Sequence, residues 1–217
     1  MTAAELVSVL RSLGTKRNRE GQRRFGITPS TVHLGVGIPP LRQLARTHRH
    51  NHALARELWT TGIHEARILA SLVDDPKAVT RAQMNRWASD FDSWDVCDQV
   101  CGNLFDQTAF AIPAALAWVT RKPEFVRRAG FVLMAEMAVH RKDLPDSLFL
   151  SFLPVIRAGS TDERNFVRKA VNWALRQIGK RNPALRRRAT AEARRIAKID
   201  SKAARWIARD ALRELSG

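Results

Sequence analysis

The chain has 217 residues, of which 45% are hydrophobic, a formal net charge of +16 and a pI of about 11.4. This length supports a sizeable core in one domain or one elongated array. No apolar run is long enough to span a bilayer and no signal-peptide segment opens the chain, so we expect a cytoplasmic protein. The positive charge favours polyanionic partners, either nucleic acid or an acidic membrane surface.

Nearly every segment has the hydrophobic spacing of a helix. Residues 3–13 predict a short amphipathic helix, and a run of basic residues follows it. Residues 26–40 are rich in glycine and proline and form the only long irregular stretch, which serves either as a connector or as a binding loop. Residues 41–48 resume as helix and carry Arg42 on one face.

Further along, helices of about 10 to 18 residues alternate with short breaks. Proline stands near several predicted helix starts: Asp75-Pro76, Ile112-Pro113, Lys122-Pro123, Leu144-Pro145 and Asn182-Pro183. We predict about twelve helices in antiparallel pairs of roughly 30 to 45 residues, the period of a HEAT-type solenoid. The prediction is therefore a single all-α domain over residues 1–217, with a compact orthogonal bundle as the alternative.

The segment after Phe91 predicts a helix with one buried stripe, formed by Cys97, Val100, Cys101, Leu104 and Phe105. Ser93 can cap its start, and Asp95 suits the helix dipole in the first turn. Trp94 and Asp98 lie one turn apart at the edge of the stripe. They are either an ordinary helix start, with a partly buried indole and a solvated carboxylate, or a functional pair.

No metal site is predicted from the cysteines or histidines. Cys97 and Cys101 have no nearby histidine to complete a ligand set, so we interpret them as small buried hydrophobic residues. The run of His48, His50 and His52 lacks acidic or cysteine partners.

Two later helices combine apolar and basic residues. Residues 124–140 are apolar nearly all round, so Arg127 and Arg128 must either meet a partner or groove or extend to solvent. Residues 165–179 place Trp173 between Lys169 and Arg176, which suits stacking and phosphate contacts, although such a Trp also fits a core. Gly179 is predicted to end this helix.

The last predicted helices are dense in arginine, and their basic face either is merely solvated or contacts nucleic acid. We select four basic residues as candidate DNA contacts: Arg42, Lys169, Arg176 and Lys202. Trp59 and Trp118 are expected in the core.

Several stretches together resemble the DNA alkylation repair family of HEAT-like DNA glycosylases. They are Gly35-Val36 through Leu41-Arg42-Gln43-Leu44-Ala45, Leu58-Trp59 with His64-Glu65-Ala66-Arg67, Ser93-Trp94-Asp95-Val96-Cys97-Asp98, Val126-Arg127-Arg128-Ala129, and residues 167–176. The resemblance implies a C-shaped superhelix that grips duplex DNA in a basic concave face and removes N3- or N7-alkylated purines. It departs from the family where Ser93 stands in place of a second Trp.

The resemblance also assigns roles. It places the family's aromatic and carboxylate on Trp94 and Asp98, its groove arginine on Arg128 and its second aromatic on Trp173. An alkylated purine is cationic and leaves readily, so the carboxylate would stabilise the positive charge that develops on the sugar. The aromatic faces would lie against that charge, and the arginine would hold a phosphate. No cofactor is expected.

Three functions are compared. The first is a monofunctional alkylpurine DNA glycosylase, acting as a monomer on alkylated duplex DNA without a membrane partner. The second is a non-catalytic HEAT-type binder of branched DNA or structured RNA, which would not need Asp98. A protein scaffold ranks last, because it would carry a less one-signed charge.

Overall fold

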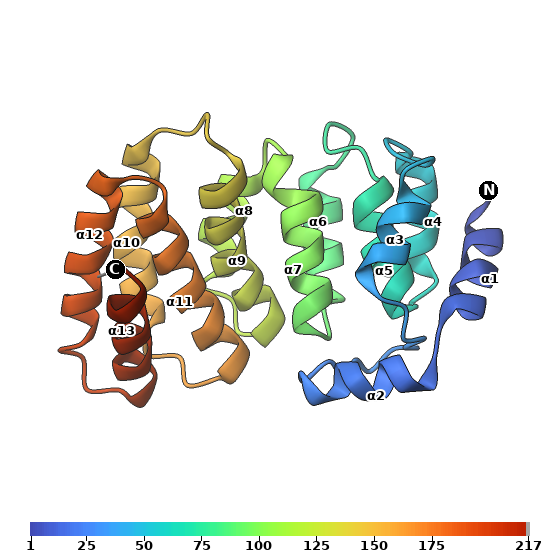
Figure 1. The fold of residues 1–217 in the computed structure, drawn as a ribbon. Helices are drawn as coiled ribbons and strands as arrows, with labels where there is room; N and C mark the ends of the chain where they lie inside the picture. The colour runs from blue at the N-terminus through green and yellow to red at the C-terminus, as the bar shows by residue number, and fades with distance from the viewer. Residues whose placement is uncertain (216–217) are drawn as a thin grey trace. The chain divides into compact units, whose positions relative to one another are not determined.

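The computed structural model describes residues 1–215, and within them the chain forms thirteen α-helices and one 3-10 helix (Figure 1). The only β-pairing among these residues is an isolated bridge between Val32 and Ile63. The prediction of an all-α protein is therefore confirmed. The chain divides into two compact units, Met1–Ala109 and Phe110–Gly217.

The first unit contains α1 (Ala3–Leu13), α2 (Lys16–Arg24), α3 (Ile38–Ala45), α4 (His52–Thr60), α5 (His64–Val73), α6 (Arg81–Ser89), α7 (Trp94–Asn103) and the 3-10 helix (Phe105–Gln107). Helix α5 is its centre, because α1, α3, α4 and α7 all pack against it. Helix α2 differs from the others: it has no buried residue and runs crosswise to α3, α4 and α5 in Figure 1.

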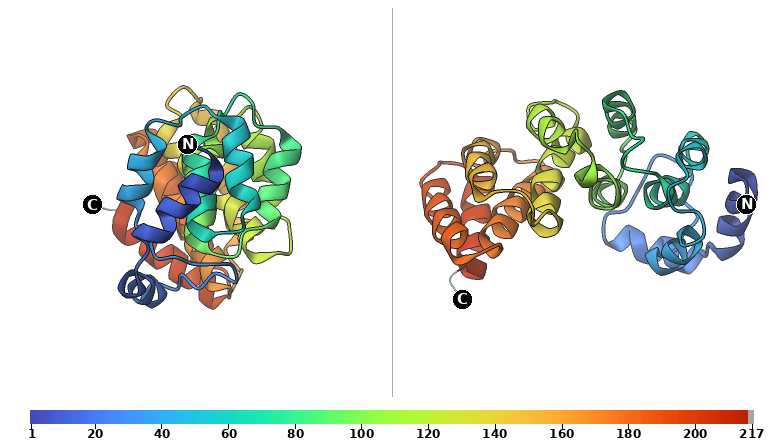
Figure 2. Two further views of the ribbon diagram at one scale, coloured as in Figure 1. Left: turned by 90° about the vertical axis from the view of Figure 1, so that its right-hand side faces the viewer. Right: turned by 90° about the horizontal axis from the view of Figure 1, so that it is seen from above.

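The second unit contains α8 (Ala111–Trp118), α9 (Glu124–His140), α10 (Asp146–Gly159), α11 (Asn165–Lys180), α12 (Pro183–Ile196) and α13 (Lys202–Leu215). Helix α9 packs against α8 and α11, and α11 also packs against α12 and α13. The right-hand view of Figure 2 shows many helices nearly end-on, with sequence neighbours packed as pairs. None of the helices in residues 1–215 has the length and apolar character that a membrane span requires.

The buried stripes follow the predictions closely. Helix α9 has the predicted bounds, and Phe131, Val132 and Leu133 at its middle are buried. All five predicted stripe residues of the α7 region are buried, including the free cysteines Cys97 and Cys101. Trp59 and Trp118 are buried as expected.

Three expected boundaries were wrong. No helix begins at Pro76; a turn follows it, and α6 begins at Arg81, where the Thr80 side chain accepts a hydrogen bond from the backbone N–H of Gln83. The irregular stretch ends at Gly37 because Pro39 and Pro40 fit the first turn of α3, where no amide donor is needed. Gly179 lies inside α11.

Gly179 is closely packed, because a Cβ there would lie 2.7 Å from a Leu215 methyl carbon, which would have to move. Gly130 of α9 has a similar place against α8. A Cβ at Gly130 would lie 2.7 Å from the backbone nitrogen of Val119 and 2.9 Å from the carbonyl oxygen of Ala115. The two helices therefore approach at a distance that only glycine permits.

We predict that Gly130→Ala lowers the free energy of unfolding by about 1–3 kcal/mol, because the backbone of α8 cannot easily move away. Gly21→Ala in exposed α2 is the matched control, since a Cβ there meets nothing within 4 Å. It should be neutral or stabilise by about 0.5–1 kcal/mol through helix propensity. Urea unfolding of both variants checks this, and equal effects would contradict the close approach of α8 and α9.

Candidate active site

Helix α7 presents Trp94 and Asp98 on successive turns, and both side chains are half-buried. The indole N–H of Trp94 donates to the carbonyl oxygen of Phe25 at 3.1 Å. Phe25 directly follows basic helix α2 and is 75% exposed, which is unusual for a large apolar side chain. The backbone of Phe25 thus lies beside the candidate pair, a contact that sequence reasoning missed. The only signal was a lone Phe between a basic run and Gly26.

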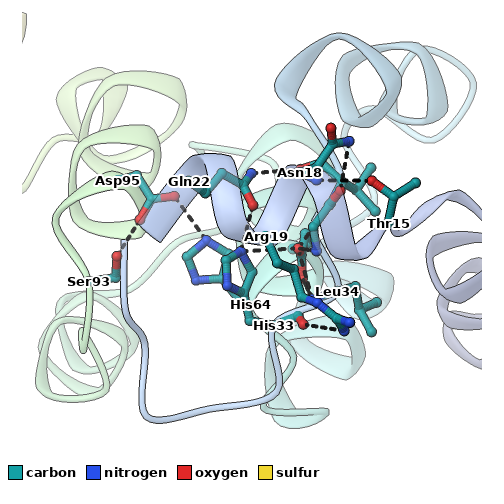
Figure 3. A network of polar contacts seen from close by, with 12 residues as sticks. Thr15, Asn18, Arg19, Gln22, His33, Leu34, His64, Ser93 and Asp95 are labelled. Carbon is teal, nitrogen blue, oxygen red and sulfur yellow. Dashed lines mark hydrogen bonds and ion pairs between the residues drawn. The ribbon is translucent and has the colours of Figure 1, made fainter. Parts of the chain in front are cut away.

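The start of α7 is held by a buried polar contact with α5 (Figure 3). His64 Nε2 and Asp95 Oδ2 lie 2.9 Å apart, and His64 is 1% exposed. Ser93 donates its hydroxyl to the other Asp95 oxygen. The expected side-chain cap by Ser93 is therefore absent; the hydroxyl is directed to Asp95 instead of the backbone. Asp95 does lie in the first turn, but it is buried and serves as a link between helices.

This buried pair has shifted pKa values. Burial by itself lowers the pKa of His64, but the Asp95 hydrogen bond and the nearby carboxylates outweigh it and raise that pKa. Burial by itself raises the pKa of Asp95, yet hydrogen bonds from His64 and Ser93 and the charge of His64 lower it below its ordinary value. Both shifts favour the charged pair. The pair therefore fixes the helix that carries Trp94 and Asp98.

The next residue on α5, Glu65, fixes the irregular stretch between α2 and α3. Its buried carboxylate accepts three backbone N–H groups, from Leu34 at 3.0 Å, Gly35 at 2.5 Å and Val36 at 3.1 Å. Gly35 has a φ of +84°, and a Cβ there would lie 2.5 Å from the Thr15 carbonyl oxygen. A glycine is thus required both for the turn and for the approach of α2.

A second carboxylate holds the same stretch nearer Phe25. Asp92 accepts the Ser30 hydroxyl at 2.9 Å and the backbone N–H of Thr31 at 3.1 Å. The backbone N–H of His64 donates to the Val32 carbonyl at 2.9 Å. The loop is therefore tethered at several points along its length.

In the second unit, Arg128 is only 5% exposed and donates to the carbonyl oxygen of Phe166 at 2.5 Å. Arg127 instead lies 3.3 Å from Asp162, a carboxylate that Arg164 also binds, at 2.6 Å. Both arginines thus have partners, so neither simply extends to solvent. The two differ in depth, because Arg128 is buried and Arg127 is only partly so.

Trp173 of α11 is half-buried, as an aromatic at the edge of an apolar stripe should be. Arg176, one turn on, forms ion pairs with Glu214 and, at 3.6 Å, with Asp210 of α13. Lys180 pairs with Glu214 too, and its hydrogen bond lowers the pKa of that carboxyl. Arg176 therefore links α11 to α13. By contrast, Lys169, Lys202 and, in the first unit, Arg42 are exposed.

Among residues 1–215 no cluster of three histidine, cysteine or acidic side chains is placed to hold a metal ion. His52 of the histidine run instead binds Asp74 at 2.7 Å.

The fold and these residues define a class: a HEAT-like repeat protein with a half-buried Trp–Asp pair on a tethered helix. The chain belongs to the family described as DNA alkylation repair enzyme, whose model matches residues 6–215. Solved structures match it as well. One is described as "a new family of proteins related to the HEAT-like repeat DNA glycosylases with affinity for branched DNA structures". It is 22% identical, covers 98% of this chain and 95% of its own, and has a TM-score of 0.81. The search of curated proteins gave no match.

We predict that the His64–Asp95 pair stabilises the first unit most at mildly acidic pH. The raised pKa of His64 means that its contribution is complete below about pH 6.5 and is lost as the pH rises through the raised value. The lowered pKa of Asp95 means that its contribution is present above about pH 3.9 and is lost as the pH falls through the lowered value.

A double-mutant cycle with His64→Gln and Asp95→Asn measures this by urea unfolding. The coupling should be about 1–3 kcal/mol at pH 6 and smaller at pH 9. A coupling that stays constant between these pH values would contradict a charged pair.

Proposed function

We propose that this protein is a monofunctional DNA glycosylase that hydrolyses the N-glycosidic bond of N3- or N7-alkylated purines in duplex DNA. The observation that supports this most is the Trp94–Asp98 pair, half-buried on a helix whose start is fixed by the buried His64–Asp95 contact. Membership of a DNA alkylation repair family agrees with it. A catalytic carboxylate must be held rigidly, because a displacement of about 1 Å from the reacting atoms costs much of the rate enhancement.

The proposed reaction is simple because the substrate is already activated. The C1′–N bond breaks, and its electron pair neutralises the cationic base, which therefore leaves without protonation. Asp98 stabilises the positive charge that develops on the sugar and orients the attacking water. The water oxygen then bonds to C1′ and releases its proton to solvent. No lysine nucleophile is invoked, so the products are a free base and an abasic site in an unbroken strand.

The other predicted residues take supporting roles. Trp94 and Trp173 would lie against the deoxyribose or the cationic base, where an aromatic face attracts positive charge. Arg128 would hold a phosphate beside the lesion, and Arg42, Lys169 and Lys202 would contact the DNA backbone. Arg176 would contact the DNA backbone too, with a phosphate replacing the carboxylates of Glu214 and Asp210 as the partner of its guanidinium. We propose that the protein acts as a monomer, without a cofactor.

A second candidate is a non-catalytic binder of branched DNA. It is favoured by the shared fold with a protein described as having affinity for branched DNA structures. A binder would use the same cations, and its affinity would show the same strong salt dependence, so salt titration does not separate the two candidates. Base release does.

We predict that wild-type protein releases 7-methylguanine and 3-methyladenine from methylated duplex DNA. Asp98→Asn should lower the rate on the order of 100-fold or more, because the charge that stabilises the transition state is lost. Asp200→Asn is the matched control: it removes a fully exposed carboxylate and changes the net charge equally. It should leave the rate unchanged, while DNA binding should be retained in both variants.

Two outcomes would reject this proposal. Equal rates for Asp98→Asn and wild type would remove the carboxylate from the mechanism. Wild-type protein that binds branched DNA but releases no base, beside an active control glycosylase, would favour the non-catalytic binder.

We predict that Arg128→Lys lowers base release by about tenfold, since an ammonium cannot hold both a phosphate and the Phe166 carbonyl as a planar guanidinium can. Arg127→Lys is the matched control, because a lysine can keep the ion pair with Asp162. Single-turnover rates check the effect, and thermal unfolding shows whether either variant is merely unstable. A larger loss in Arg127→Lys would reverse the assignment.

A further inference from the structure

Helix α2 is the most basic element of the first unit, with five cationic residues and one carboxylate, Glu20. It has no buried residue, so apolar burial does not hold it in place. It is held instead by its own polar side chains, which donate hydrogen bonds to backbone carbonyls of the loop. Asn18 donates to the Gly35 carbonyl at 3.1 Å, and Gln22 donates to the Val36 carbonyl at 3.4 Å. The fold thus orders a charged helix in a fixed orientation although none of its residues is fully buried.

A cavity of about 540 Å³ lies between this helix and the loop. Its basic lining consists of Lys16, Arg19 and Arg23, three cations against the single carboxylate of Glu20. Lys16 and Glu20 lie 3.9 Å apart, but both side chains are well exposed, so this pair cancels little of the field. The opposite wall is formed by loop residues 28–33.

The loop wall adds a donor. Thr31 lines the cavity, and its Oγ1 atom is buried without a hydrogen-bond partner among the described residues. Asp92 accepts a hydrogen bond from the backbone N–H of Thr31 and so holds this part of the wall in place. A buried hydroxyl without a partner is costly and signals a missing ligand or water.

His33 closes the cavity next to Arg19. Arg19 donates to the His33 carbonyl at 3.4 Å, and the His33 ring lies 2.7 Å from the Gln22 side-chain oxygen. Burial, together with the nearby His64, lowers the pKa of His33. The positive charge of the cavity therefore comes from the lysine and arginines, which stay charged at neutral pH.

We propose that this cavity binds a phosphate group of a DNA strand, as a site separate from the Trp94–Asp98 pair. Guanidinium and ammonium groups beside a hydroxyl donor are a set that recognises phosphate oxygens. The inference rests on DNA being the partner, as in the proposed function, but not on base release. The phosphate comes either from within a strand or from a strand end.

The helix itself offers a matched test. Lys16→Ala with Arg23→Ala removes two cavity charges, whereas Arg17→Ala with Arg24→Ala removes two charges from the same helix outside the lining. Fluorescence anisotropy with unmodified duplex DNA should show at least a tenfold loss of affinity for the cavity pair and less than a threefold loss for the control pair. The slope of log affinity against log salt should also become shallower by about one for the cavity pair.

Two single substitutions refine the test. Thr31→Val removes the hydroxyl at constant charge and should weaken binding severalfold with an unchanged salt slope. Glu20→Gln removes the opposing carboxylate and should strengthen binding. Equal losses of DNA affinity in the two double variants would overturn the cavity site, because only the overall positive charge of α2 would then explain the binding.

Duplexes with and without a 5′-phosphate distinguish the two sources. Tighter binding of the phosphorylated duplex that disappears in the cavity variant places a strand end there, while equal binding places an internal phosphodiester. Unchanged DNA affinity in the cavity variant, with base release intact in wild type, would refute this inference alone. If the cavity variant binds DNA more weakly but the wild-type protein releases no base, only the proposal of glycosylase activity is refuted.

Discussion

Two neighbouring residues in the first turn of α5 organise the first unit. His64 holds Asp95 at the start of α7, and Glu65 gathers three backbone amides of the loop before α3. Both contacts are buried, where a broken pair leaves an uncompensated polar group or charge and is costly. The loop and α7 are thus positioned from one rigid turn of one helix. A substitution that shifts this first turn of α5 would displace Phe25 and Trp94 together, because the Trp94 indole binds the Phe25 carbonyl.

This arrangement explains how a helix as polar as α2 keeps a defined place. Ordering nine residues costs conformational entropy, and α2 has no fully buried residue to offset that cost. The offset comes from hydrogen bonds between side chains of α2 and a loop that Glu65 has already ordered. Gly35 lets the two backbones approach. The cations of α2 are consequently fixed in direction, and a fixed array binds an anion with less entropic loss than mobile side chains do.

The sequence was sufficient for the fold wherever one periodic pattern decided the structure. The bounds of α9 and the buried stripe of α7 followed from apolar spacing alone. It failed where the deciding contact is distant in sequence. The sequence predicts a helix start at Pro76, although proline serves a turn equally well. It predicts a helix end at Gly179, whereas the Leu215 methyl carbon that a Cβ there would meet comes 36 positions later. In the same way, Ser93 fits a cap by type, but Asp95 competes for its hydroxyl. No sequence pattern around Phe25 marks it as a candidate site residue, and only its contact with Trp94 in the structure does so.

The carboxylates of this basic chain serve different purposes. The chain has 21 acidic residues against 37 lysines and arginines, and several of the acids are bound within the fold. Glu65 and Asp92 tether the loop, Asp95 tethers α7, and Asp162 pairs with arginines. Each of these stabilises a particular contact. At the half-buried edge of α7, the Asp98 carboxylate would repel the phosphates of a bound DNA strand and lower the affinity for it. In the proposed glycosylase the same negative charge acts on the positive charge that develops at the sugar during release of a cationic base, so a cost in affinity is matched by a gain in rate.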